Sequence, residues 1–412
     1  MPPIRCRTDF EKSVIVANFE KRGWLQSVND MEWNVYWASV GNIKQWFNPD
    51  SGQRLGDDQI INHFPNHGEL TRKDMMVKNV KRYRKEVEKE YALAGVVGEV
   101  EGVDPLDEID FVPATYTLPA DYSLFVEEFR RNTGATWIMK PARGAQGTGI
   151  FLINKLSQIK KWATGGRYPQ GGAAAAAHTY VVSRYIAEPL LVSNKKFDLR
   201  LYVLVTSYRP LKAYIHKQGF ARFCTSEYSS DVQDMDNAYM HLTNVAIQKH
   251  GEECENYEFC ITDEKLCIKK HKNEEICIKN DEFCSYNANH GGKWSMANLM
   301  LYITSTRGAT DSAMLAASID TVIIHSLRAC QNVMINDKHC FELYGYDVLI
   351  DANLKPWLIE VNVSKSHEFC IQNKELYTNN KELCNKNKEF SIKKDEFCRH
   401  LRASRRRLRP TG

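Results

Sequence analysis

Three oxygen-bearing side chains, Asp347, Glu360 and Asn362, are the residues of this chain whose types and spacing could hold a metal ion. They lie in or directly after two runs of β-branched and aromatic residues, 344–350 and 357–361, which flank an Asp-Ala-Asn sequence typical of a turn. Side chains at positions i and i+2 of a strand share a face, so Glu360 and Asn362 point together, and a hairpin would place Asp347 opposite them. Few carboxylates with phosphate oxygens form the ligand set that Mg²⁺ takes. We therefore expect a magnesium site, with polar strand ends exposed to water as the plainer alternative.

A lysine and a glycine-rich loop lie in residues 136–152, TWIMKPARGAQGTGIFL. Lys140 ends an apolar run, and the glycines after it allow backbone N–H groups to turn inward around a phosphate. The loop lacks Gly-Lys-Ser/Thr and a following helix, so it is not a Walker A loop, and it does not fit G-x-G-x-x-G. Because predicted strands flank it on both sides, we interpret it as a phosphate-binding loop of another kind.

Charged residues alternate along residues 195–216, which are predicted to form two strands. Lys196, Asp198 and Arg200 fall on one face, and apolar residues fall on the other. A row of buried charges costs free energy unless it has partners, so a binding site explains the pattern better than the alternative, a solvated edge strand. Arg222 lies on a further predicted strand and adds a second arginine.

Short polar side chains follow in HLTNVAIQKH, residues 241–250. Thr243, Asn244 and Lys249 of this segment could reach a nucleotide or a small zwitterion. We therefore count them as candidate ligands of the same site.

The chemistry that needs all these groups is carboxylate activation. A kinase would also bind MgATP, but the chain has no HRD or DFG element. In carboxylate activation, ATP phosphorylates a carboxylate, and an amine then displaces the phosphate to form an amide. That reaction needs Mg²⁺, lysines for the phosphates and an arginine for the developing charge, but no protein nucleophile.

The elements that must position these residues start with residues 11–50, whose mixture of aromatic, apolar and charged positions suits a small α/β unit with a tryptophan-rich core. A helix is predicted from Lys73, because Met76 and Val80 begin an apolar stripe at helical spacing. Its other face, from Lys78 to Lys85, is basic. That face is either solvated or a docking surface for an acidic polymer.

The composition bounds the class of protein. The chain has 412 residues, 43% of them hydrophobic and 26% charged, which suits two or three soluble domains. We find no apolar run long enough for a membrane helix and no secretory signal, so we expect an intracellular protein with neither a membrane nor a nucleic acid as partner. Eight of the 12 cysteines lie in two low-complexity tracts, 252–287 and 365–398, and no C-x-x-C pair occurs, so we expect reduced thiols and no zinc site. We assign these tracts no function.

Six ordered segments resemble the tubulin tyrosine ligase-like family. They are WIMKPARGAQGTGIFLI, KKFDLRLYVLV, GFARFC, HLTNVAIQKH, HCFELYGYDVLID and KPWLIEVN. The resemblance runs from residue 10 to residue 362 and is closest to the branch that contains the catalytic subunit of the tubulin polyglutamylase complex. It implies an α+β chain with the ATP-grasp fold.

The resemblance also implies a division into domains. An N-terminal domain with the basic helix would span residues 1–115, and a central ATP-grasp domain 116–192. A C-terminal ATP-grasp domain would span 193–364, with the low-complexity insertion at 252–287. A low-complexity basic tail would occupy 365–412.

Roles for the candidate residues follow from the same resemblance. The ATP phosphates would be held by Lys140, Lys196 and the loop Gln146, Gly147, Thr148, Gly149 and Ile150. The adenine and ribose would lie beside Ser183, Arg184, Tyr185, Ile186 and Asp198, with Thr243 and Asn244 nearby. Arg200 and Glu360 would be catalytic, Arg222 and Lys249 would bind the amino acid, and Asp347, Glu360 and Asn362 would bind Mg²⁺.

The implied function is tubulin polyglutamylation, the MgATP-dependent addition of L-glutamate to glutamate side chains of tubulin C-terminal tails. Two cations in the amino-acid pocket, Arg222 and Lys249, favour a dianionic amino acid. A glycine or tyrosine ligase of the same family and a catalytically inactive microtubule-binding homologue are the alternatives. The chain departs from the family pattern at Thr148, where a basic residue is usual, and at 363–365, where Val-Ser-Lys replaces small residues and a proline.

Partners and location are also expectations that rest on the resemblance. They are tubulin tails on microtubules, free L-glutamate and non-catalytic subunits of a polyglutamylase complex. The expected location is the cytoplasm and cytoskeleton, at a cilium or basal body.

Overall fold

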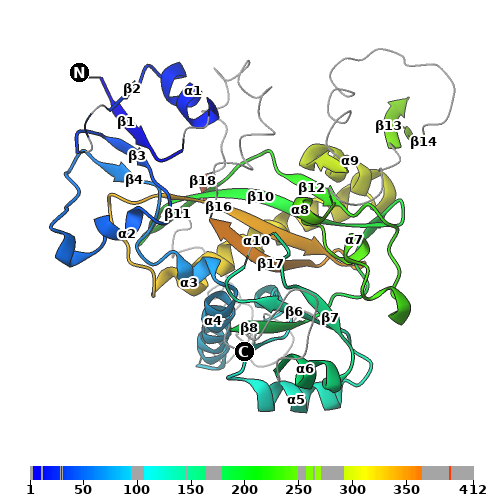
Figure 1. Ribbon diagram of the computed structural model, residues 1–412. Coiled ribbons are helices and arrows are strands. Elements are labelled where there is room, and N and C mark those ends of the chain that lie inside the picture. The colour runs from blue at the N-terminus through cyan, green and yellow to red at the C-terminus, as the bar shows by residue number, and fades with distance from the viewer. Residues whose placement is uncertain are drawn as a thin grey trace, which may run out of the picture.

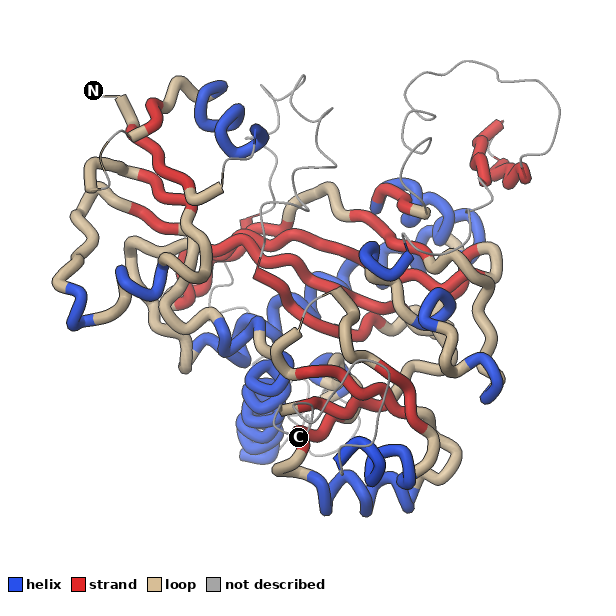
Figure 2. The backbone as a smooth tube through the Cα atoms, viewed as in Figure 1, coloured by secondary structure: helices blue, strands red, loops and turns tan. Residues whose placement is uncertain are grey.

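The computed structural model describes residues 3–10, 13–27, 29, 31–93, 106–144, 146–163, 179–248, 257–262, 265–270, 292–363 and 389–390. The fold is mixed α+β, as predicted, with a small parallel sheet, a four-stranded antiparallel sheet and a large antiparallel sheet (Figure 1). Figure 2 shows the four-stranded sheet below the large one, with the parallel sheet to one side.

The N-terminal unit is the parallel sheet with short helices around it. Its elements are β1 (Arg5–Thr8), α1 (Ser13–Lys21), β2 (Leu25–Gln26), β3 (Val35–Trp37), α2 (Ile43–Trp46), a 3-10 helix (Pro49–Ser51) and β4 (Ile60–Ile61), and the strand order is β2-β1-β3-β4. Trp33 and Trp46 are buried and meet edge-on with ring centroids 5.3 Å apart. Trp24 and Trp37 are half-buried against a smaller apolar cluster. The tryptophan-rich core expected here is therefore divided between two clusters.

Two helices, α3 (Gly68–Thr71) and α4 (Lys73–Leu93), lead out of this unit. The second begins at the predicted residue and buries the predicted stripe, including Met76 and Val80. Those residues share one apolar cluster with Trp33 and with strands of the large sheet. The N-terminal unit and the large sheet thus have a common core, and the division into domains stays a prediction.

The four-stranded antiparallel sheet packs against helices on one face. Its elements are β5 (Thr115–Leu118), α5 (Tyr122–Arg131), β6 (Trp137–Pro141), β7 (Phe151–Ile153), α6 (Leu156–Ala163) and β8 (Tyr180–Arg184), with strand order β5-β8-β6-β7. Phe125 and Phe129 of α5 and Trp162 of α6 pack with Trp137 and Met139 of the sheet. Because side chains alternate along a strand, residues such as Lys140 point to the opposite face, away from these helices.

The large sheet is organised around one long strand, β10 (Lys195–Tyr208). The other strands are β9 (Leu191–Val192), β11 (Leu211–Ile215), β12 (Phe220–Phe223), β15 (Lys293–Ser295), β16 (Glu342–Ile350), β17 (Pro356–Val363) and β18 (Glu389–Phe390). The first half of β10 pairs with β12, its second half pairs with β11, and β16 pairs along its other edge. The predicted strand pair at 195–216 and the predicted hairpin at 344–361 are both confirmed.

The remaining helices lie around the large sheet. They are a 3-10 helix (Asp107–Ile109), a 3-10 helix (Val232–Asp234), α7 (Ala238–His241), α8 (Val245–Gln248), α9 (Met296–Arg307) and α10 (Ala309–Gln331), and a separate hairpin is formed by β13 (Tyr257–Thr262) and β14 (Lys265–Lys270). From the sequence we expected no apolar run long enough for a membrane helix, but α10 is long and apolar enough by length and composition. Half of its most apolar stretch is buried in the fold. Its apolar residues, including Leu315 and Ile323, lie in the same core cluster as the sheet strands. It is therefore packed as a core helix.

Candidate active site

A pocket lies between the four-stranded antiparallel sheet and the large sheet. Apolar walls with a few converging polar groups are typical of small-molecule sites. Apolar walls come from α4 and both sheets, and include Met76, Ile138 and Leu358. The predicted residues that line it are Lys140, Gln146, Gly147, Thr148, Ile150, Ser183, Arg184, Tyr185, Ile186, Lys196, Asp198, Thr243, Asn244, Asp347 and Glu360. Segments distant in the sequence thus meet in one cavity.

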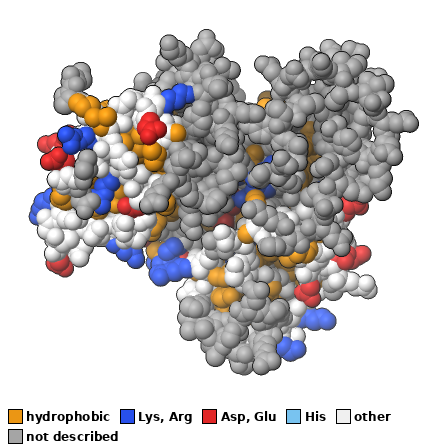
Figure 3. Space-filling view, turned by 45° about the horizontal axis from the view of Figure 1, so that its top comes forward, with side chains coloured by type: hydrophobic (Ala, Val, Ile, Leu, Met, Phe, Trp, Pro, Cys, Tyr) orange, Lys and Arg blue, Asp and Glu red, His pale blue; other side chains and the backbone are white. Residues whose placement is uncertain are grey.

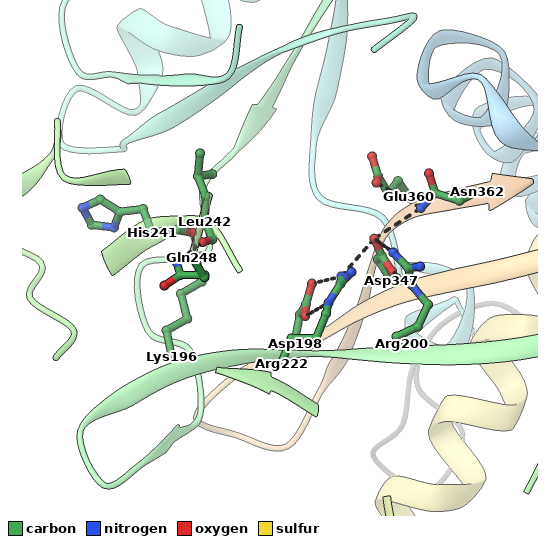
Figure 4. Close-up of polar contacts among 10 residues, drawn as sticks. All are labelled: Lys196, Asp198, Arg200, Arg222, His241, Leu242, Gln248, Asp347, Glu360 and Asn362. Carbon is green, nitrogen blue, oxygen red and sulfur yellow. Dashed lines mark hydrogen bonds and ion pairs between the residues drawn. The ribbon is translucent and has the colours of Figure 1, made fainter. Parts of the chain in front are cut away.

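The β16–β17 hairpin brings the three expected metal ligands together. Asp347 lies directly opposite Glu360, and the register shifts just after this pair. The amide Nδ2 of Asn362 donates to Asp347 Oδ2 at 3.3 Å and to Glu360 Oε1 at 3.0 Å (Figure 4). Two carboxylates that line the pocket, with the Asn362 amide beside them, are groups that suit a Mg²⁺ site with positions left for phosphate oxygens. The donor set fits the metal.

Asp347 is held by two arginines from the neighbouring strands. Arg200 donates its Nε–H to Oδ1 at 2.5 Å, and Arg222 Nη2 lies 3.0 Å from Oδ2 (Figure 4). Burial raises the pKa of Asp347, but the two guanidinium groups outweigh it and lower the pKa to about 2. The carboxylate is therefore ionised at neutral pH, as a metal ligand must be.

Arg222 also pairs with Asp198. Its Nε–H donates to Asp198 Oδ1 at 2.7 Å, across the β10–β12 ladder, where the two residues are direct partners. All of these groups are at least 94% buried. Arg200, Arg222 and Asn362 do not line the pocket themselves but contact residues that do, namely Asp198, Asp347 and Glu360. A buried network of this kind keeps charges only because each has partners.

Three lysines, Lys73, Lys140 and Lys196, also line the pocket. Lys140, at the end of β6, is buried, and burial lowers its pKa to about 8, while Glu360 acts to raise it. Lys73, at the start of α4, lies with Nζ 2.6 Å from Glu360 Oε2 and 3.4 Å from Gly144 O. The sequence predicts Lys73 only as the beginning of a helix and does not identify it as a site residue. The one local signal is a lysine at a helix start after a segment rich in Asn and His, and no motif spacing or periodicity links that signal to a binding site.

The third lysine, Lys196, has defined partners. Its Nζ donates to the Tyr185 hydroxyl at 2.9 Å and to the His241 carbonyl at 3.0 Å. Tyr185 immediately follows β8 and Ser183 lies within it, and the Ser183 hydroxyl is 2.8 Å from the Thr115 hydroxyl of β5. The segment predicted to lie beside the adenine and a lysine predicted to hold phosphates are therefore in direct contact.

The glycine loop packs against the segment that carries Thr243 and Asn244. Gln146, Gly147 and Gly149 have positive φ angles, of 64°, 77° and 74°. A Cβ at Gly147 would overlap the Ile247 side chain of α8 and lie 3.2 Å from Asn244 Oδ1. The loop therefore lies against this segment at the edge of the pocket. Lys249, the second predicted amino-acid ligand, falls outside the described residues.

The basic face of α4 is partly neutralised within the fold. Lys81 donates to the Thr115 carbonyl at 2.6 Å, Arg82 donates to the Ala329 carbonyl at 2.9 Å, and Arg84 pairs with Glu88 and Asp110. On the face seen in Figure 3, Lys and Arg side chains are interspersed with Asp and Glu over the N-terminal elements. Several basic residues of α4 thus have partners within the fold, which weakens the interpretation of this helix face as a docking surface for an acidic polymer.

The fold and the pocket together define a class of protein. Two antiparallel sheets enclose a pocket that is lined by three lysines, a glycine-rich loop and two carboxylates, with an amide beside the carboxylates. These are the parts of an ATP-dependent ligase, in which phosphates and a metal ion are held without a protein nucleophile.

Comparisons with known proteins agree with this class. Residues 51–285 and 267–380 match the tubulin-tyrosine ligase family. The chain is 49% identical over 365 residues to a Tetrahymena thermophila protein named "Probable alpha-tubulin polyglutamylase Ttll1", with 88% of this chain and 80% of that protein covered. It is 40% identical over 364 residues to the Caenorhabditis elegans "Probable tubulin polyglutamylase ttll-9", and 37% identical over 389 residues to the Bos taurus "Probable tubulin polyglutamylase TTLL9". Each of these two matches covers 88% of this chain and 74% of the relative.

The chain therefore belongs to the tubulin-tyrosine ligase family. Membership implies the ATP-grasp fold and makes the protein an ATP-dependent ligase. The resemblance of the six sequence segments to this family is confirmed.

Proposed function

We propose that this protein is a tubulin polyglutamylase. It would use MgATP to join the amino group of free L-glutamate to a glutamate side chain in the C-terminal tail of tubulin. The observation that carries the proposal is the pocket in which Lys73, Lys140 and Lys196 face Asp347 and Glu360. The three relatives are named as probable tubulin polyglutamylases, which supports the choice of substrate and amino acid.

The first chemical step would transfer the γ-phosphoryl group of ATP to a tail carboxylate, giving an acylphosphate and ADP. Lys73, Lys140 and Lys196 would hold the phosphates as point charges, since lysine binds phosphate in this way. Mg²⁺, held by Asp347, Glu360 and Asn362, would supply charge neutralisation at the phosphates. Arg200, which contacts Asp347, would stabilise the acylphosphate.

The second step would be attack of the glutamate amine on the acylphosphate carbonyl. The C–N bond forms, inorganic phosphate leaves, and the amine loses a proton. We propose that Arg222 and Lys249 bind the carboxylates of the incoming amino acid, because cations favour a dianion over glycine or tyrosine. Arg222 is already 2.7 Å from Asp198, so it would have to share its five donors between that carboxylate and the substrate.

The nucleotide base would lie along Ser183, Arg184, Tyr185 and Ile186, with the ribose at Asp198 and the phosphates under the loop from Gln146 to Ile150. Apolar residues of the pocket, including Met76 and Leu358, suit an adenine ring. Thr243 and Asn244 would complete this wall.

Tubulin tails on microtubules would be the protein partner, which places the protein at the cytoskeleton in the cytoplasm. Non-catalytic subunits of a polyglutamylase complex, and a position at a cilium or basal body, are part of the proposal and rest on analogy with the family alone.

The test is incorporation of labelled glutamate, glycine or tyrosine into microtubules with MgATP, alone and with added cell extract to supply partner subunits. We expect glutamate to be incorporated, and Glu360→Gln to abolish incorporation because it removes a metal-binding charge at constant shape. Incorporation of glycine or tyrosine in place of glutamate would support the other ligases of the family. MgATP binding without incorporation under either condition would support the inactive microtubule-binding homologue.

A further inference from the structure

Lys196 is aimed into the pocket by a chain of hydrogen bonds that extends well behind it. Lys196 is 95% buried as a residue, and its ammonium group donates to the Tyr185 hydroxyl at 2.9 Å and to the His241 carbonyl at 3.0 Å. An ammonium group has three N–H donors in tetrahedral arrangement. With two of them fixed, the direction of the third is set, and Lys196 lines the nucleotide pocket.

The Tyr185 hydroxyl is itself oriented by His241. The hydroxyl lies 2.9 Å from His241 Nδ1, and Nε2 of the same ring lies 2.9 Å from the Asp234 carbonyl. A carbonyl can only accept, so Nε2 carries the proton, and Nδ1 of the neutral ring accepts from Tyr185. The hydroxyl therefore points its proton at His241 and its lone pair at Lys196.

Aromatic contacts support the same geometry. Lys196 Nζ lies 4.4 Å from the centroid of the Tyr185 ring and 6.0 Å from that of Tyr228, both within cation–π distance. The Tyr185 and Tyr228 rings each meet His241 edge-on. The ring of His241 is thus fixed by packing as well as by its two hydrogen bonds.

The backbone behind Lys196 is held by a glutamine. Gln248 donates to the Leu242 carbonyl (Figure 4). It also donates to the Tyr239 carbonyl, on the other side of His241, and accepts from the Thr225 amide at 2.8 Å. This contact fixes the segment whose carbonyl receives Lys196. Every acceptor of Lys196 is therefore held by a further group.

We propose that Tyr185, acting through its hydroxyl and held by His241, is a positioning residue that aims Lys196 at the phosphates of ATP. The inference rests on the proposed function only for the identity of the nucleotide. It assigns the Tyr185 side chain a role separate from that of its backbone, which would lie along the adenine.

The experiment is a double-mutant cycle on MgATP affinity, measured by isothermal titration calorimetry on the full chain without tubulin. Tyr185→Phe keeps the ring over Lys196 and removes only the hydroxyl. We expect this variant to bind MgATP about tenfold more weakly, the effect of misdirecting one charge-assisted contact. In a Lys196→Met background the same change should have no further effect, because the group that it positions is gone.

Tyr302→Phe is the matched control, since it removes the hydroxyl of a half-buried ring outside the pocket. It should leave MgATP affinity unchanged. The inference would be overturned if Tyr185→Phe bound MgATP within twofold of the affinity of the unmutated chain. It would also be overturned if Tyr185→Phe reduced MgATP affinity equally in the Lys196→Met background, because that result would indicate a general structural effect. Failure of the unmutated chain to bind MgATP would overturn the proposed function together with it.

Discussion

Lys73 and Glu360 form an ion pair of 2.6 Å that joins the start of helix α4 to strand β17, which carries two of the proposed metal ligands. Their side chains are only 10% and 17% exposed, so the pair is largely screened from solvent. The contact links an element of the N-terminal half to the last strand of the pocket, and it places a third lysine where phosphates and a metal ion would meet.

Removing Lys73 should weaken nucleotide binding. Lys73→Met keeps the length of the side chain but removes the charge, so Glu360 loses its cation and the phosphates lose a contact. We expect MgATP affinity to fall about tenfold to a hundredfold, in line with 1.5–3 kcal/mol for a charged contact. Lys78→Met on the exposed side of the same helix is the control and should bind normally. Equal affinity of the Lys73 and Lys78 variants would remove Lys73 from the site.

The affinity for MgATP should depend on pH through Lys140. Burial lowers its pKa to about 8, so the charge that attracts phosphate is lost as the pH rises through that value. We expect the dissociation constant to rise between pH 7.5 and 9.5, and to stay flat in Lys140→Arg, whose guanidinium keeps its charge. A rise of the same size in both proteins would assign the effect to another group.

The same shift affects stability with the opposite sign. An unfolded lysine titrates near pH 10.5, so between pH 8 and 10.5 the unfolded chain binds more protons at this residue than the folded chain does. The contribution of Lys140 to the free energy of unfolding therefore increases as the pH rises from 8 to 10.5, while nucleotide binding weakens. Thermal unfolding of the unmutated chain and of Lys140→Arg over this pH range would separate the effect on stability from the effect on binding.

Gly147→Ala should displace the glycine loop. The residue has a φ of 77°, which costs an alanine about 1 kcal/mol, and its new Cβ would overlap Ile247. We predict weaker MgATP binding and little change in the unfolding midpoint, because the strain lies in a loop. Gly134→Ala is the control, since a Cβ there would meet no atom within 4 Å. Normal nucleotide affinity in the Gly147 variant would argue against a phosphate-binding role for the loop.

Glu342 should be essential for stability. Its carboxylate, 1% exposed, lies 2.9 Å from His63 Nδ1 and accepts from the Phe64 amide at 3.1 Å, which ties the N-terminal unit to strand β16. Glu342→Ala leaves both groups buried without that partner, so we expect a loss of about 2–4 kcal/mol in urea unfolding.

The exposed pair Arg5–Glu32 offers the comparison for that measurement. Glu32 is 61% exposed, and Glu32→Ala should cost less than about 1 kcal/mol. Equal losses of unfolding free energy in Glu342→Ala and Glu32→Ala would show that the buried contacts of Glu342 stabilise the fold no more than an exposed ion pair does.

Several parts of the site could be predicted from the sequence because they depend on local periodicity. The β16–β17 hairpin follows from two apolar runs around a turn, and the shared direction of Glu360 and Asn362 follows from their spacing. The stripe on α4, which begins with Met76 and Val80, is predicted equally well. In each case the residues that decide the structure are neighbours in the chain.

Other parts could not be predicted because they depend on which elements pack together. Nothing near Lys73 indicates that it meets Glu360, and nothing near Arg222 indicates that it is shared between Asp198 and Asp347. The charges on α4 illustrate the reverse case. Their pattern suggested an open basic surface, but Arg84 finds Glu88 one turn along the helix and Asp110 in a distant segment.

The order of the site residues along the chain has a consequence for the protein's synthesis. Lys73 is translated early, whereas Glu360 and Asn362 lie on β17, which pairs with β16 near the end of the described sheet. A nascent chain that lacks β17 has the lysines, the glycine loop and Asp347, but not Glu360 and Asn362, the other two proposed metal ligands. The proposed ATP site is therefore complete only after β17 has left the ribosome. Until then Asp347 is the one proposed metal ligand that has been synthesised, and Arg200 and Arg222 can already contact it.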